Sequence, residues 1–145
     1  MAFEIRPDDD NAAGAAGHGN AYDSNVTVIV CSSCRGPDGS DERPRPGEFL
    51  ATAAREAAEG SDIAVLAVEC LGNCKRRLSA SLVKRGGWSY VFGDLSPENG
   101  ADLIAGARLF AEAPEAVLPW RGRPDCLKRG LVARIPPLEL CKDPS

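Results

Sequence analysis

Four of the six cysteines occur in two closely spaced pairs, Cys31-x2-Cys34 and Cys70-x3-Cys74. The first pair directly follows the apolar run "VTVIV". The second pair begins one residue after the apolar run "IAVLAV". Thiolates are soft ligands that bind zinc or the iron of a cluster, and two neighbouring thiols can also form a reversible disulfide. The cysteines therefore predict either a metal site or a redox dithiol.

Two predicted strands, over residues 26–30 and 63–68, would bring both pairs to one place. Between them lie a loop at residues 35–47, dense in Gly, Pro and Asp, and a helix with Glu48 in its first turn that stops at Gly60. The apolar stripe of this helix is expected at Phe49, Leu50, Ala53, Ala54 and Ala57. Strand, helix and strand predict a βαβ unit with parallel neighbouring strands. Because such strands end at the same edge of the sheet, we expect Cys31, Cys34, Cys70 and Cys74 to form one four-thiolate site.

The residue types leave three chemistries open at this site. Four cysteines are typical of a [2Fe-2S] cluster and of structural Zn²⁺. A domain with two helices and four strands, however, should have enough hydrophobic core to fold stably without structural zinc. A thioredoxin-type dithiol is disfavoured because Gly36-Pro37 follows Cys34, where that chemistry usually has a helix N-terminus, and it would leave the second pair unexplained. Rieske ligation is excluded, since it needs two histidines and the chain has only His18.

Basic residues and glycines accompany the cysteine pairs. Gly36, Gly39 and Gly72 would let backbone amides approach the sulfurs. Lys75, Arg76 and Arg77 directly follow the second pair, where they would stabilise thiolates and form a docking rim for a redox partner. The other two cysteines, Cys126 and Cys141, are interpreted as surface thiols or packed small side chains.

The remaining elements predict the fold class. Residues 79–95, "SASLVKRGGWSYVFGDL", predict an antiparallel hairpin turning at residues 85–87, with Trp88, Tyr90 and Phe92 packing as core on one face. A helix follows Ser96, with Leu103, Ile104, Ala107 and Phe110 as its apolar stripe. The order β-α-β-β-β-α is that of an α/β, thioredoxin-like domain with a four-stranded mixed sheet and flanking helices. Residues 119–145 should form a basic C-terminal arm, extended apart from one short helical turn.

Charge and composition narrow the class further. Residues 1–25 carry five acidic residues and one arginine in an Ala/Gly-rich stretch, which predicts a disordered tail containing His18. Residues 26–118 would then be the folded domain. No basic stripe alternates with aromatics as in single-stranded nucleic-acid binders, and neither a signal peptide nor a membrane span is evident. We expect a cytoplasmic protein that binds neither nucleic acid nor membranes.

Two resemblances extend this reading. "VCSSCRG", "ECLGNCKR", "WSYVFGDL" and "PWRGRPDCLKRGLVARIPP" resemble a family of predicted metal-binding proteins, domain of unknown function 1636, over about residues 26–138. The cysteine pairs and the element order are similar to the thioredoxin-like [2Fe-2S] ferredoxins and the ferredoxin-like subunit of respiratory complex I. These ferredoxins separate their first two cysteines more widely than Cys31 and Cys34.

The resemblance implies that Cys31, Cys34, Cys70 and Cys74 hold one [2Fe-2S] cluster. It also implies an electron carrier rather than an enzyme, a homodimer with redox proteins as partners, and a link to cobalamin or cobalt metabolism. The residues themselves provide no other catalytic set, because the lone histidine lies in the tail and no phosphate-binding glycine loop precedes a helix. A zinc-binding or metal-chaperone module and a thiol-disulfide oxidoreductase are the alternative functions.

Overall fold

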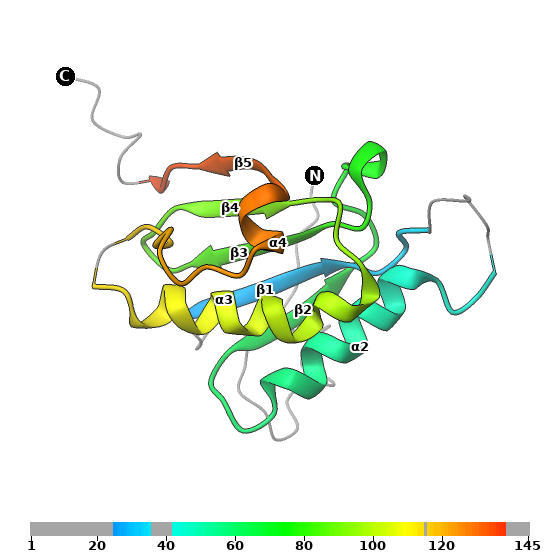
Figure 1. Cartoon of the computed structure of the whole chain (residues 1–145), viewed down its shortest axis with the longest axis horizontal. Helices are drawn as coiled ribbons and strands as arrows, with labels where there is room; N and C mark the ends of the chain where they lie inside the picture. Colours follow the sequence, from blue (N-terminus) through cyan, green and yellow to red (C-terminus); the bar gives the residue numbers. More distant parts are fainter. Residues whose placement is uncertain (1–24, 36–41, 115, 139–145) are drawn as a thin grey trace.

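The chain forms a mixed five-stranded sheet (Figure 1). The computed structural model describes residues 25–35, 42–114 and 116–138. The strands are β1 (Val26–Cys31), β2 (Ala64–Val68), β3 (Ala80–Lys84), β4 (Ser89–Phe92) and β5 (Leu131–Ile135). Their order in the sheet is β2-β1-β3-β4-β5, with β1 and β2 parallel and the other neighbours antiparallel. The α/β class and the parallel β1–β2 pair are thus confirmed.

The predicted number of four strands is wrong, because the basic arm contributes a fifth. β5 pairs with β4 so that Arg134 lies opposite Tyr90 and Ala133 opposite Val91. Its sequence, "LVARI", gives little sign of a strand because it is short, contains an arginine and is mostly exposed. The short helical turn predicted in the arm is present as α4 (Cys126–Arg129).

The helices lie on one face of the sheet (Figure 1). They are α2 (Pro46–Ala58) and α3 (Gly100–Glu112), with the 3₁₀ turns η2 (Cys74–Arg76) and η3 (Pro97–Asn99). The predicted stop at Gly60 fits its φ of +83°, which favours glycine. The predicted stripe of α2 is wrong at Phe49, which is 51% exposed, because α2 instead turns Gly47, Leu50, Ala51, Ala54 and Ala58 inward.

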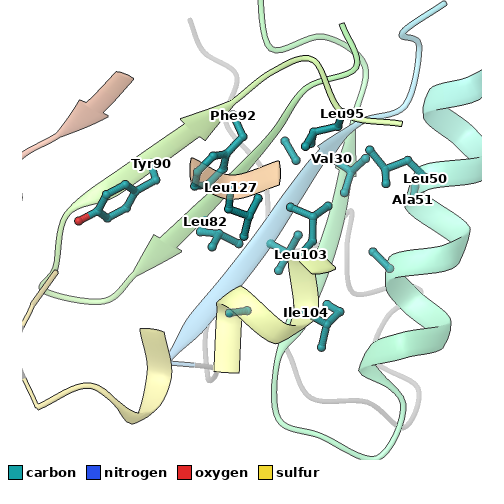
Figure 2. Packing of buried hydrophobic residues seen from close by; sticks show 14 of the residues in the cluster. Val30, Leu50, Ala51, Leu82, Tyr90, Phe92, Leu95, Leu103, Ile104 and Leu127 are labelled. Carbon is teal, nitrogen blue, oxygen red and sulfur yellow. The ribbon is translucent and has the colours of Figure 1, made fainter. Parts of the chain in front are cut away.

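One hydrophobic core fills the space between sheet and helices (Figure 2). Val26, Val28 and Val30 alternate inward along β1, as the apolar run predicts. Tyr90 and Phe92 are buried as expected, and Phe110 meets Tyr90 edge to face at 5.5 Å between ring centroids. Trp88 is only partly buried. β2 is half-buried rather than buried because it is an edge strand.

A buried arginine attaches the start of the C-terminal arm to this core. Arg123 is 8% exposed and donates hydrogen bonds to the carbonyl oxygens of Leu118 at 2.7 Å and Pro119 at 3.1 Å. Its guanidinium also lies over the rings of Tyr90 and Trp120, at 5.7 and 5.0 Å from their centroids. These contacts position the segment that leads into α4 and β5.

Some expectations concern residues outside the described ranges. They are the expectations for residues 1–24 with His18, for Gly36 and Gly39, and for Cys141. Within the described ranges, none of the helices combines the length and the apolar character needed to cross a bilayer.

Candidate metal centre

The structure brings all four paired cysteines to the wall of one cavity of about 230 Å³. The cavity lies at the C-terminal ends of β1 and β2, as the parallel pairing predicts. Its lining residues are Cys31, Ser33, Cys34, Arg35, Arg45, Cys70, Cys74 and Arg77. Two chain segments that are separated by 35 residues, from Cys34 to Cys70, thus meet around a single space.

The two serines between Cys31 and Cys34 attach the first loop to the second. The backbone N–H of Ser32 and its hydroxyl both donate to the Val68 carbonyl oxygen, at 2.8 and 3.0 Å. The Ser33 hydroxyl donates to the Glu69 carbonyl oxygen. Because Val68 and Glu69 directly precede Cys70, these hydrogen bonds fix the position of one cysteine pair relative to the other.

Helix α2 packs its first turn directly against the first cysteine loop. The Gly47 N–H donates to the Cys34 carbonyl oxygen at 3.1 Å. A Cβ on Gly47 would lie 2.3 Å from the Cys31 carbonyl oxygen and 3.0 Å from the Cys34 nitrogen, so only glycine allows this approach. The positive end of the helix dipole therefore lies beside Cys31 and Cys34, although α2 begins only at Pro46.

The second pair is held by a turn and a short 3₁₀ segment. The Gly72 N–H donates to the Cys70 sulfur at 3.2 Å, with Gly72 at a φ of +76°. Cys74 begins η2, and the Arg77 Nε donates to its carbonyl oxygen at 2.9 Å. Asn73 donates to the buried Ser79 hydroxyl at 2.9 Å, which anchors η2 at the start of β3.

The two pairs differ in exposure and in protonation. Cys31 and Cys34 are 3% and 7% exposed, whereas Cys70 and Cys74 are exposed. A hydrogen bond from the Cys34 thiol lowers the pKa of Cys31 to about 5, and the Leu71 backbone amide adds to this effect against the opposing effect of burial. The same hydrogen bond, together with burial, raises the pKa of Cys34. The two shifts have opposite directions, so Cys31 is the thiol of the inner pair that ionises first.

Three arginines surround the thiols, and the sequence indicated only one of them as part of the site. Arg77 lines the cavity from the second loop, and Arg35 and Arg45 line it from the first loop. Arg45 also donates to the Ser33 carbonyl oxygen at 3.1 Å. Arg76 instead pairs with Asp94 at 2.7 Å, and the exposed Lys75 is not part of the cavity wall. Arg45 lies 11 residues beyond Cys34 and was missed because only the packing of α2, whose N-cap it is, places it at the cavity.

The sulfurs surround the cavity without meeting at a point. Among the described residues, no three Cys, His, Asp or Glu side chains are close enough together to hold a single metal ion as they stand. Tetrahedral zinc needs four ligand atoms within about 2.3 Å of one centre. Four thiols spread around a cavity of about 230 Å³ instead fit a group that contains several atoms.

Cys126 lies apart from this cavity, on α4. Its side chain is partly buried against the core, and burial together with the nearby Asp102 carboxylate raises its pKa to about 11. A protonated, packed thiol agrees with the interpretation of Cys126 as a small core residue.

The comparisons with known proteins place the chain in a family. The model of the family described as "Protein of unknown function (DUF1636)" matches residues 28–137. The chain belongs to this family. The resemblance seen in the cysteine and arm motifs of this DUF1636 protein is thus confirmed. A comparison with curated proteins gives no match.

Solved structures similar to the DUF1636 protein include thioredoxin-like [2Fe-2S] ferredoxins. A thioredoxin-like [2Fe-2S] ferredoxin from Aquifex aeolicus matches with a TM-score of 0.50 and 19% identity, covering 79% of this chain and 96% of that one. A structure of the wild-type thioredoxin-like [2Fe-2S] ferredoxin from Aquifex aeolicus matches with a TM-score of 0.48 and 14% identity, covering 76% and 98%. The first of these likenesses supports the thioredoxin-like ferredoxin fold.

Proposed function

We propose that this DUF1636 protein is a one-electron carrier that holds a [2Fe-2S] cluster on Cys31, Cys34, Cys70 and Cys74. The observation that carries the proposal is the shared cavity, which all four thiols line without converging on one point. The ferredoxin fold of the similar Aquifex aeolicus structure supports the same cofactor.

The residues around the cavity have suitable chemistry for this group. Bound to four thiolates, such a cluster would accept and release one electron. Arg35, Arg45 and Arg77 would offset the negative charge of the thiolates, and the α2 dipole acts in the same direction at Cys31 and Cys34. The Gly72 amide would donate to the Cys70 sulfur, a contact that tunes reduction potentials in such sites.

The two cysteine pairs differ in solvent exposure, so the two sides of the site differ in their access to a partner. Burial of Cys31 and Cys34 keeps solvent from the inner side of the cavity, whereas Cys70 and Cys74 reach the surface. A redox partner would therefore exchange electrons at the Cys70–Cys74 side, beside Lys75, Arg76 and Arg77. These basic residues favour an acidic partner surface, so the rate of electron exchange should fall as salt rises. A rate independent of ionic strength would refute this docking surface.

One observation favours a second function. The Cys34 thiol donates to a Cys31 sulfur whose pKa is about 5, and both lie beside the N-terminus of α2. A low-pKa thiol next to a second thiol and a helix N-terminus is the arrangement used by thiol-disulfide oxidoreductases. Dithiol reductase activity that needs Cys31 and Cys34 but not Cys70 and Cys74 would support it.

The visible absorption spectrum of anaerobically purified protein, before and after dithionite, tests the proposal. We expect charge-transfer bands that bleach on reduction, with two irons and two acid-labile sulfides per chain as the cofactor formula requires. Cys70→Ser and Cys74→Ser should each lose the native spectrum, while the matched control Cys126→Ser keeps it. A colourless protein with stoichiometric zinc, or native spectra in both site variants, would refute the assignment.

The biological context is proposed on the resemblance alone. The resemblance implies a link to cobalamin or cobalt metabolism, in which an electron carrier would supply a reductive step. The carrier would act in the cytoplasm between a reductase and an acceptor enzyme.

A further inference from the structure

The basic arm carries a concentration of positive charge that the cysteine cavity does not use. Residues 119–134 contain five cationic side chains and a single carboxylate, Asp125. Trp120 lies in the same segment and is 59% exposed. An accessible indole among cations is a feature that the proposed electron carrier leaves unexplained.

The structure gathers the arm cations around two tryptophans that are far apart in the sequence. The Lys128 Nζ lies 5.1 Å from the ring centroid of Trp120, and the Arg123 guanidinium lies 5.0 Å from it. The Arg134 guanidinium lies 4.4 Å from the ring centroid of Trp88. We call these five residues the arm surface. The alternation of cations with rings that the linear sequence lacks thus arises on folding.

The positive charges of the arm surface have no carboxylate partner among the described residues. In the described part of the arm, the ion pair between Arg129 and Asp125 engages the sole carboxylate of the segment. Burial lowers the pKa of Arg123, Tyr90 opposes this shift, and the positive charge of Arg134 adds to it. Cations that lie over aromatic rings keep their full charge. The arm surface should therefore attract an anionic segment.

The segment that precedes β1 enters the fold at the edge of the sheet where the arm surface lies. Figure 1 shows that β1 begins and β5 ends at this edge. One row of paired residues crosses the sheet there from β1 to β5, namely Thr27, Val83, Ser89 and Ile135. Trp88 and Arg134 adjoin this row along the chain. Three strand spacings separate β1 from β5, which amounts to about 14 Å.

We infer that the three aspartates at residues 8–10 of this chain bind its own arm surface. Residues 1–24 lie outside the described ranges, and their sequence contains five acidic residues and one arginine. Fifteen residues lead from Asp10 to Asn25, and a chain of that length spans up to about 50 Å, so it reaches the arm surface easily. Opposite charge selects the acidic run as the occupant, and the covalent tether favours the run of the same chain over that of a second copy.

The inference is independent of the cofactor. The cysteine cavity lies at the C-terminal ends of β1 and β2, whereas the row through Thr27 lies near the start of β1. Removing the charges at residues 8–10 should therefore leave the amount of bound cluster per chain unchanged. Cluster absorbance reports on the proposed function, and contacts of the arm surface report on the acidic run.

Zero-length carbodiimide cross-linking of the full-length protein, read by mass spectrometry, tests the contact. The reagent joins a carboxylate to an amine only where the two are in contact, and Lys128 supplies the amine of the arm surface. We expect cross-links from residues 8–10 to Lys128 that are lost as salt rises. In a mixture of unlabelled and isotope-labelled chains, they should join peptides of the same label.

Three results of the cross-linking would overturn the inference. They are the absence of a cross-link to Lys128, a cross-link of residues 8–10 to Lys75 in its place, and cross-links that join differently labelled chains. The second result would place the acidic run at the docking rim, and the third would assign the arm surface to another copy of the chain.

The indole N–H signals of the two tryptophans give a second readout by nuclear magnetic resonance. The combined variant Asp8→Asn, Asp9→Asn and Asp10→Asn should shift the Trp120 signal in the direction that raising the salt does in the wild type. The matched control combines Glu56→Gln, Glu59→Gln and Asp62→Asn, which removes the same charge at exposed positions on and beside α2. The control should keep the wild-type signals. Wild-type indole signals in the variant at residues 8–10 would overturn the inference.

Discussion

Replacing Gly47 with alanine separates local helix propensity from tertiary packing. Gly47 has ordinary helical backbone near the start of α2, so propensity alone predicts that alanine stabilises the protein by up to about 1 kcal/mol. The structure predicts the opposite sign. The new Cβ would lie 2.3 Å from the Cys31 carbonyl oxygen, whereas ordinary contacts begin at 3.4 Å. The cysteine loop or the helix would have to move by about 1 Å in a close-packed region.

The expected cost follows from these two opposing effects. Overpacking in a well-packed region costs about 1–3 kcal/mol, and the upper end applies because both obstructing atoms belong to the backbone. Subtracting the gain in propensity leaves a net destabilisation of about 2 kcal/mol. The movement also displaces Cys31 and Cys34, so the amount of bound cluster per chain should fall.

Urea unfolding of the metal-free protein would measure the free energy, and absorbance per chain would measure cluster content. The matched control is Thr52→Ala, at an exposed position of the same helix. Alanine there should raise the free energy of unfolding by up to about 0.7 kcal/mol. A Gly47→Ala protein as stable as the wild type and with full cluster content would refute the close packing of α2 against the cysteine loop.

Two further predictions concern protonation and the arm. In metal-free protein, Cys31→Ser identifies the part of the thiolate absorbance that belongs to Cys31. That absorbance should titrate with a midpoint near pH 5, because the lowered pKa leaves Cys31 ionised above this pH and protonated below it. A midpoint near the ordinary value of 9 would contradict the Cys34 hydrogen bond. Arg123→Met should lower the free energy of unfolding by about 3–6 kcal/mol, because its two hydrogen bonds to the Leu118 and Pro119 carbonyl oxygens contribute about 1.5–3 kcal/mol each. Hydrogen exchange should speed up in β5. An unchanged midpoint in urea would show that Arg123 does not anchor the arm.

The main features of the site could be predicted from local patterns. β-Branched runs that end at cysteines, with a helix between them, are enough to predict parallel strands and a common edge, and the structure shows both. Other features of the site depend on tertiary contacts that a single sequence does not show. The rotation of α2 that exposes Phe49 depends on Gly47 meeting the cysteine loop, and no periodicity in the helix encodes that contact.

The missing strand and the missing arginines have a similar cause. β5 is short and exposed, and it forms because β4 offers an edge and Arg123 holds the preceding segment in place. Arg45 lines the cavity from the N-cap of α2, which packs against the first cysteine loop. Such long-range arrangements leave no spacing signal in a single sequence. The same holds for the dipole of α2, which reaches Cys34 through space rather than along the chain.

The crossover between β1 and β2 also sets the order of events during maturation. In the unfolded chain the two cysteine pairs are separate dithiols with 35 residues between them, and neither pair offers four ligands. The proposed ligand set would be complete only after β2 has docked beside β1 and Ser32 has bonded to Val68. A scaffold that delivers a preassembled cluster would therefore have to recognise the folded protein, and a cluster once inserted would lock the crossover against opening.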